Sequence, residues 1–329
     1  MYTFCYYRNS FKMFNTSFYR ASSSRSMSLK QTEKVVTIKA PWGNISGITW
    51  GEPSKPPVLL APGRIVPCSS FRPIVFKLPT SFFYVAFDFP GNGLSDPLPK
   101  GLRFTIYDLI PTIKKIIEYY KWKQFVYIAH SLGTLVGKHF NIIYPGYMLK
   151  IVDIDPLPAY LITENISEWY KETYENHYEE NVYAKHTGRK ESAPKYKYEQ
   201  AKKIIQKAQN LSDKAVAHIL DRYLEPAGDG LYRFTYDQRM KIFFKMPIKP
   251  NDLKEMYTAS ATPTLAIFST QTIDKEYYKK TPFAMDEHAW PNRNYRYKIV
   301  EGGHDVYLEN PDCMAEDISN FLLDCMSKL

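Results

Sequence analysis

The segment Gln124–Pro145 constrains the fold more than any other part of the sequence. Its first six residues are mostly β-branched or aromatic, which is typical of a short buried strand. The pentapeptide Ala129–Gly133 (Ala-His-Ser-Leu-Gly) follows, and a run with helical spacing then continues to the proline. A strand, a tight turn with a serine at its apex and a helix predict a nucleophile elbow. Such a turn lifts the hydroxyl of Ser131 out of the sheet, beside the N-terminus of the helix.

Apolar runs on either side of this segment alternate with helical patterns. Candidate strands lie at residues 35–40, 44–50, 57–61, 82–88, 151–155, 263–268 and 296–300, and the last helix spans 311–326. The first two candidate strands are close enough in sequence to form a hairpin. The alternation of the others with helices predicts a mostly parallel sheet with helices on both faces.

Residues 157–250 interrupt this alternation. They are rich in tyrosine, lysine and glutamate, and they contain helical runs but no convincing buried strand. We therefore predict a core made of residues 33–156 and 251–329, with residues 157–250 inserted as a helical cap. Residues 1–32 contain five basic residues and no acidic one, and are expected to form a poorly ordered leader.

A serine hydroxyl becomes an effective nucleophile only with a base within hydrogen-bond reach. Among the seven histidines, His304 is the best candidate for this base. It ends the turn Gly302–His304, between the last predicted strand and the last predicted helix, where glycines let an imidazole swing toward the serine. The order of serine first and histidine later also fits a nucleophile elbow. His130 is interpreted as a packing neighbour of the nucleophile.

The acid that orients this histidine has two candidates. Asp155 stands at the end of the strand after the elbow helix. Asp274 lies past the strand 263–268, where a carboxylate commonly follows, although Thr272 occupies the usual position. Placement favours Asp155, and Asp274 remains the alternative.

Two backbone amides are expected to form an oxyanion hole. One is the N–H of Leu132, directly after the nucleophile, and the other is the N–H of Arg64, in the loop after the strand 57–61. The Arg64 side chain then lies near the mouth of the site, either in contact with substrate or in solvent.

Composition excludes several other classes of protein. The net charge of +9 is spread along the chain without a basic block or a nucleic-acid-binding motif, so a soluble enzyme is favoured over a nucleic-acid binder. No apolar run is long enough to cross a membrane. The four cysteines lack metal-ligand spacing, and neither a metal nor an organic cofactor is expected.

The two ends of the chain carry different targeting signals. Ser327-Lys328-Leu329 matches a peroxisomal import signal, which an import receptor reads at a free carboxyl end. The N-terminus, basic and rich in serine, is similar to a mitochondrial transit peptide. We favour the peroxisome, with the mitochondrion or the cytoplasm as alternatives.

Taken together, these motifs resemble the α/β-hydrolase superfamily over almost the whole chain after residue 33, and within it the serine hydrolase-like proteins. The residues that carry the resemblance are Ala129–Gly133, Asp88-x-x-Gly91-x-Gly93-x-Ser95, Gly302–His304 with Glu309-Asn310-Pro311, and the peroxisomal tail. The resemblance implies an eight-stranded sheet, a helical cap over the pocket, and Ser131 and His304 as nucleophile and base. Members usually have His-Gly where this chain has Pro62-Gly63, and often glycine at Ala129.

The leading functional hypothesis is a serine hydrolase of the carboxylic-ester or thioester class (EC 3.1) that works through an acyl-serine. The peroxisomal signal makes lipid esters or acyl-CoA thioesters reasonable small-molecule substrates. The alternative is a non-catalytic binding or sensor protein on a hydrolase scaffold, which the altered oxyanion loop motivates.

Overall fold

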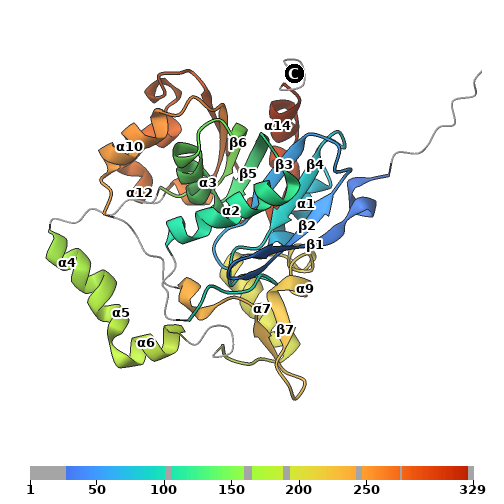
Figure 1. The fold of residues 1–329 in the computed structure, drawn as a ribbon, viewed down its shortest axis with the longest axis vertical. Coiled ribbons are helices and arrows are strands. Elements are labelled where there is room, and N and C mark those ends of the chain that lie inside the picture. Colours follow the sequence, from blue (N-terminus) through green and yellow to red (C-terminus); the bar gives the residue numbers. More distant parts are fainter. Residues whose placement is uncertain are drawn as a thin grey trace, which may run out of the picture.

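The computed structural model describes residues 27–100, 105–158, 165–187, 193–241, 247–274 and 276–324. Its centre is an eight-stranded sheet with the order β1-β2-β4-β3-β5-β6-β9-β10 (Figure 1). The strands are β1 (Lys34–Ala40), β2 (Gly43–Trp50), β3 (Pro57–Ala61), β4 (Phe83–Phe87), β5 (Phe125–His130), β6 (Met148–Ile154), β9 (Thr264–Ser269) and β10 (Tyr295–Val300). β2 pairs antiparallel with β1 and β4, and the other pairings among these strands are parallel. The prediction of a mostly parallel sheet is confirmed.

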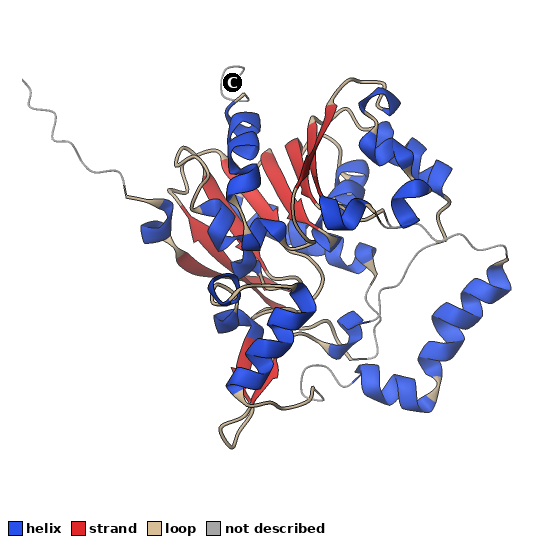
Figure 2. Cartoon of the chain, turned by 180° about the vertical axis from the view of Figure 1, so that it is seen from behind, coloured by secondary structure: helices blue, strands red, loops and turns tan. Residues whose placement is uncertain are grey.

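Helices cover both faces of the sheet, as predicted (Figures 1 and 2). The flanking helices are α1 (Arg72–Val75), α2 (Ile106–Tyr120), α3 (Leu132–Ile143), α13 (Val306–Glu309) and α14 (Asp312–Leu323). Because alternate residues of a strand point to opposite faces, Leu59 of β3 packs with α2 and α3. Its neighbours Val58 and Leu60 pack with α1, α13 and α14. The central strands are therefore apolar on both sides, which explains their continuous hydrophobic runs.

The segment of residues 157–250, here called the inserted segment, is mainly helical. Its described elements are α4 (Ile166–Tyr170), the π-helix η3 (Lys171–Glu175), α5 (Asn176–Tyr178), α6 (Glu180–Thr187), α7 (Tyr198–Gln209), α8 (Asp213–Val216), α9 (Leu220–Tyr223), β7 (Leu224–Pro226), β8 (Tyr232–Phe234), the 3-10 helix η5 (Gln238–Lys241) and the start of α10 (Pro250–Thr258). β7 and β8 form an antiparallel hairpin that the sequence did not predict. In both views α4, α5 and α6 lie farthest from the sheet (Figures 1 and 2).

Short helical elements complete the described chain. They are the 3-10 helices η1 (Leu29–Thr32), η2 (Cys68–Phe71), η6 (Pro282–Met285) and η7 (Glu287–Ala289), and the helices α11 (Thr270–Ile273) and α12 (Glu276–Lys279). Leu29 of η1 is buried in the core cluster on one face of the sheet, so this residue of the predicted leader packs against the core. Residues 1–26 of the predicted leader and the tail Ser327-Lys328-Leu329 lie outside the described residues.

The turn after β4 joins the sheet to the inserted segment through one buried carboxylate. Asp88 accepts hydrogen bonds from the backbone N–H of Cys68 at 2.7 Å and of Leu94 at 2.9 Å. The guanidinium of Arg222 in α9 donates a third at 2.6 Å. Gly93 has a positive φ of +52°, and a Cβ there would lie 2.2 Å from the Asp88 carboxylate, so glycine is required. This motif thus holds α9 against the sheet.

Candidate active site

Ser131 lies at the sharp turn between β5 and α3. Its backbone has φ 50° and ψ −115°, a conformation that non-glycine residues rarely adopt and that often marks a functional site. Gly133 makes the turn possible, because a Cβ there would lie 2.4 Å from the carbonyl oxygen of Ala61. The methyl group of Ala129 is accommodated in the buried cluster between the sheet and α3. The local geometry is that of the predicted elbow.

Three side chains from distant parts of the sequence form a hydrogen-bonded chain at this turn. The Ser131 hydroxyl lies 2.9 Å from Nε2 of His304, and Nδ1 of His304 lies 2.5 Å from Oδ2 of Asp155. The other oxygen of Asp155 accepts the backbone N–H of Ser269 at 2.8 Å, which fixes the carboxylate. With Nδ1–H donated to Asp155, Nε2 is left as the acceptor for the serine proton.

The structure brings Asp155 to the histidine and leaves Asp274 away from it. Asp155 is completely buried at the end of β6. Asp274 is exposed at the C-terminal end of α11. Of the two acids that the sequence left open, Asp155 is the one with the geometry to orient His304.

The loop after β3 lies directly beside the serine. A Cβ at Gly63 would be 3.3 Å from Cβ of Ser131 and 2.8 Å from Nδ1 of His130, so only glycine fits without displacement. Leu132 is the first residue of α3, where a backbone N–H has no acceptor within the helix. The Arg64 guanidinium donates to the carbonyl oxygens of Met240 at 3.1 Å and Lys241 at 2.8 Å. That side chain therefore anchors the inserted segment.

A cavity of about 390 Å³ opens above these groups. It is lined from the core by Gly63, Arg64, Val66, His130, Ser131, Gln271, Gly303, His304 and Asp305, and from the inserted segment by Leu157, Ala208, Gln209 and Asn210. The inserted segment thus forms one wall of the cavity. The serine keeps 7% of its surface exposed there, so the hydroxyl is sheltered but reachable.

His130 contributes more than the packing that the sequence indicates. Its ring lies between those of His304 and Tyr307, with centroid distances of 4.6 and 4.4 Å. Its Nε2 is 2.9 Å from the carbonyl oxygen of His304. Burial, and next the nearby His304, hold the pKa of His130 well below its usual range. A neutral His130 with a proton on Nε2 therefore donates to the backbone of the loop that carries His304.

Asp305 is a cavity residue that sequence reasoning missed. Its side chain is 8% exposed, and Oδ1 lies 4.0 Å from Nε2 of His130, beyond hydrogen-bond reach. Burial first, and Asp155 to a smaller extent, raise the pKa of Asp305 to about 6, against an opposing effect of His304. Burial and the Asp305 charge also raise the pKa of Tyr307 and contribute to that of Tyr223. The only sequence feature that could have identified Asp305 as a site residue is its position directly after His304.

Within the described ranges, no cluster of three or more histidine, cysteine or acidic side chains has the arrangement of a metal site. A search of the same residues for a helix long and apolar enough to span a membrane finds none.

Comparison of the sequence with known proteins identifies its family and several relatives. The family model described as alpha/beta hydrolase fold matches residues 56–311. The serine hydrolase-like protein of Danio rerio is 27% identical over 285 residues, which is 86% of this chain and 86% of the relative. The human serine hydrolase-like protein 2 is 25% identical over 293 residues, 87% of this chain and 92% of the relative. These matches confirm the resemblance predicted from the sequence motifs.

Solved structures agree on the fold. A hypothetical protein of Pseudomonas aeruginosa superposes with a TM-score of 0.76 at 18% identity, covering 90% of this chain and 100% of the other. A thioesterase domain from the curacin biosynthetic pathway gives 0.67 at 15% identity, covering 88% and 99%. A peroxisomal α/β-hydrolase of Saccharomyces cerevisiae gives 0.63 at 15%, covering 90% and 89%. At such identities the likeness shows the fold alone.

Proposed function

The chain belongs to the α/β hydrolase fold family, and from that membership and the geometry around Ser131 we propose that it cleaves a carboxylic ester or thioester through an acyl-serine intermediate. The observation that carries the proposal is the continuous path from the Ser131 hydroxyl through His304 to Asp155. The names of the relatives support a hydrolase in general, and the proposed class of bond is the finer step.

The proposed reaction assigns one role to each group. Ser131 Oγ attacks the carbonyl carbon while Nε2 of His304 takes the hydroxyl proton, and Asp155 stabilises the resulting imidazolium. The backbone N–H groups of Leu132 and Arg64 stabilise the oxyanion. His304 then returns the proton to the departing alcohol or thiol, and a water molecule hydrolyses the acyl-serine by the same steps in reverse order.

The substrate class and the cellular site belong to the same proposal. The inserted segment is proposed to act as a cap, since Ala208–Asn210 line the same cavity as Ser131. Lipid esters or acyl-CoA thioesters are the proposed substrates, and the peroxisome is the proposed location. Support for the location comes from the Ser327-Lys328-Leu329 tail, with the peroxisomal yeast neighbour as a weaker indication.

Active-site labelling and turnover test the proposal together. A fluorophosphonate probe should label the wild type and not Ser131→Ala. With p-nitrophenyl esters and acyl-CoA thioesters, Asp155→Asn should lower kcat by about 10⁴-fold, because the histidine loses the orientation that the carboxylate fixes. Asp274→Asn is the matched control and should leave kcat unchanged.

Two results would contradict the proposal. If well-folded wild-type protein takes up no label from small probes, the site does not work as a serine nucleophile, and the binding or sensor alternative gains. If Asp274→Asn rather than Asp155→Asn removes turnover, the acid is wrongly assigned.

A further inference from the structure

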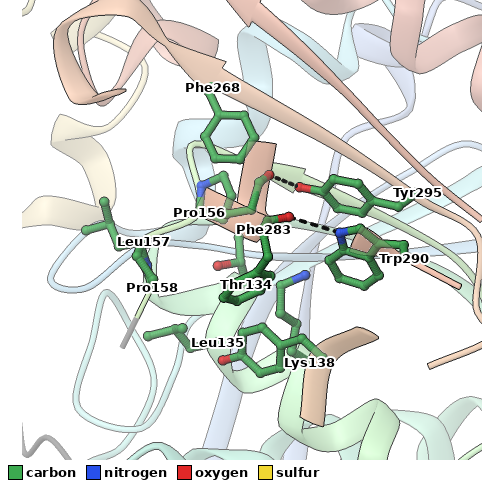
Figure 3. A pocket seen from close by; sticks show the side chains of 12 residues that line it. Thr134, Leu135, Lys138, Pro156, Leu157, Pro158, Phe268, Phe283, Trp290 and Tyr295 are labelled. Carbon is green, nitrogen blue, oxygen red and sulfur yellow. Dashed lines mark hydrogen bonds between the residues drawn. The ribbon is translucent and has the colours of Figure 1, made fainter. Parts of the chain in front are cut away.

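Two cavities share Leu157 in their walls, and each has one lysine or arginine among the described residues that line it. In the smaller cavity, of about 30 Å³, this cation is Lys138 of α3 (Figure 3). Its ammonium is hydrogen-bonded to the buried Asp153 and lies 5.3 Å from the centroid of the Tyr257 ring. The counter-charge of Lys138 is thus already present, and a space of this size holds roughly two water molecules. Lys138 therefore has a structural role.

Arg64 is the cation of the larger cavity, which also contains Ser131 and His304. The residue is exposed, and its Nη1 group donates to the carbonyl oxygens of Met240 and Lys241. Both acceptors are neutral, so they hold the guanidinium in place without balancing its charge. No described carboxylate forms an ion pair with Arg64; desolvation lowers the pKa of its guanidinium, and no charged neighbour opposes this effect. The catalytic cavity thus contains a fixed cation without a paired counter-charge.

The two nitrogens of Arg64 that donate to no described residue are those with which other arginines of this protein bind carboxylates. Nε and Nη2 lie on one edge of a guanidinium, and together they fit two oxygens of a carboxylate or a phosphate. At Arg72 this edge binds Glu33, with Nε 3.1 Å and Nη2 2.9 Å from Oε1. At Arg222 it binds Asp88, with Nε 3.2 Å and Nη2 2.6 Å from Oδ2. The free edge of Arg64 is therefore suited to the same kind of acceptor.

Arg239 has an arrangement that Arg64 shares only in part. Nη1 of Arg239 donates to a neutral acceptor, the carbonyl oxygen of Pro99, at 2.7 Å. Nε and Nη2 of Arg239 lie 3.1 and 2.7 Å from Oδ2 of Asp237. Arg64 likewise has main-chain carbonyls at Nη1, but within the described ranges no acceptor lies at its Nε or Nη2. The group that would complete the arrangement is an anion with two oxygens.

We propose that Nε and Nη2 of Arg64 bind an anionic group of the substrate, a carboxylate or a phosphate, while Ser131 attacks the ester or thioester carbonyl. The two bonds to the inserted segment fix the guanidinium before the substrate arrives, so less conformational entropy is lost on binding. Asp305, the acidic residue of the same wall, does not supply this anion, because its carboxylate lies beside His130 and forms no ion pair with Arg64. The inference rests on the proposed hydrolysis at Ser131 and narrows its substrates to anionic esters or thioesters.

Turnover of two matched pairs of substrates tests this subsite and locates the anion. The first pair is p-nitrophenyl hemiadipate and p-nitrophenyl hexanoate, which end their acyl chains in a carboxylate and a methyl group. The second is butyryl-CoA and S-butyryl-N-acetylcysteamine, which has the same thioester but no phosphate. In at least one pair the wild type should favour the anionic member in kcat/KM by about tenfold or more, because a charge-assisted contact with two donors is gained. The pair that shows the preference identifies the source of the anion.

Arg64→Met should bring the preferred ratio close to one. Loss of the two bonds to the inserted segment affects both members of a pair alike and therefore cancels in the ratio. Arg296→Met on β10 is the control with the same change of charge, and it should leave the ratio unchanged, because that exposed residue is not among those that line the cavity. A wild-type ratio near one in both pairs, or a preference that survives Arg64→Met, overturns the subsite.

A binding measurement keeps the two proposals separable. In Ser131→Ala protein, which cannot be acylated, calorimetry should show tighter binding of the intact anionic member than of the neutral one in the preferred pair. Adding Arg64→Met should remove the difference. Equal affinities within both pairs overturn the subsite even if the wild type hydrolyses all four compounds. A binding preference that depends on Arg64, in a protein with no labelling and no turnover, overturns the hydrolase proposal alone.

Discussion

Two loops at the carboxyl ends of the strands each bury an aspartate, and they surround it in opposite ways. Asp88, after β4, receives two backbone N–H groups and the guanidinium of Arg222. Asp305, after β10, is also buried, with 7% of its surface exposed, but Oδ1 of its carboxylate receives no hydrogen bond within the described parts of the chain. A buried acid with its bonds complete holds the fold together, whereas one left without donors lowers the stability of the fold when it is ionised.

Breaking the pairing at the first loop should have the largest effect on stability. Arg222→Met leaves the Asp88 carboxylate buried without its counter-charge, and we expect the free energy of unfolding to fall by about 3–5 kcal/mol. Urea denaturation measures the change. Lys115→Met, which breaks the exposed Lys115–Glu118 pair on α2, is the control and should leave the free energy of unfolding almost unchanged, because solvent screens the pair. Equal losses in the two variants would mean that the buried pair carries no special weight.

At the loop after β10, removal of the charge of Asp305 should raise the stability of the protein rather than lower it. The pKa of Asp305 is raised from 3.8 to about 6, so the folded protein binds its proton more tightly than the unfolded chain. Below the unfolded pKa both states are protonated. As the pH rises through the window between these values the folded state loses stability, and above about pH 6 the loss is complete. Asp305→Asn, which mimics the protonated group, should therefore stabilise the protein at neutral pH by roughly 2–3 kcal/mol.

Thermal unfolding at a series of pH values checks this sign. The difference in Tm between Asp305→Asn and wild type should be near zero at about pH 3.5 and should grow up to about pH 7. If Asp305→Asn destabilises the protein at neutral pH, the carboxylate must accept a hydrogen bond in the native protein, and the contrast with Asp88 is then wrong.

The smallest effect concerns the neutral histidine beside Asp305. His130→Phe keeps a ring between His304 and Tyr307 but removes the donor to the His304 carbonyl. We expect kcat to fall about fivefold with little change in KM, because the hydrogen bond that positions the loop, worth roughly 1 kcal/mol, is lost. His139→Phe on α3 is the control and should leave kcat unchanged, since among the described residues the imidazole of His139 has a hydrogen bond only to Leu135 of its own helix, and phenylalanine keeps its ring. A matching loss in both variants would assign the effect of His130 to packing.

The parts of this molecule that local sequence determines could be predicted. The elbow follows from the strand run before Ser131 and the glycine after it, and His304 follows from its turn between the last strand and the last helix. For the acid, placement favoured Asp155 but left Asp274 open, because both acids come after a strand. What separates them is pairing between strands far apart in sequence: the parallel register of β6 and β9 brings Ser269 N–H onto Asp155.

The hairpin of the inserted segment and the buried Asp305 were also not predicted from the sequence. β7 and β8 have three residues each, too few to show the alternation that marks a strand. Asp305 was visible in the sequence as an ordinary loop aspartate. Its burial without a donor could not be predicted, because the residues of α7 and β5 that line the same cavity are brought near it only by folding.

The two bonds from Arg64 to Met240 and Lys241 have a thermodynamic consequence. Arg64, whose backbone N–H is proposed to stabilise the oxyanion, also holds the inserted segment through its side chain, so a displacement of that segment would change the geometry of the proposed donor. Coupling of this kind is reciprocal. A transition-state analogue that engages the Arg64 amide should therefore slow hydrogen exchange in residues 238–241. A ligand that fixes those residues should in turn tighten the binding of the analogue, by the same factor as the analogue tightens the binding of that ligand.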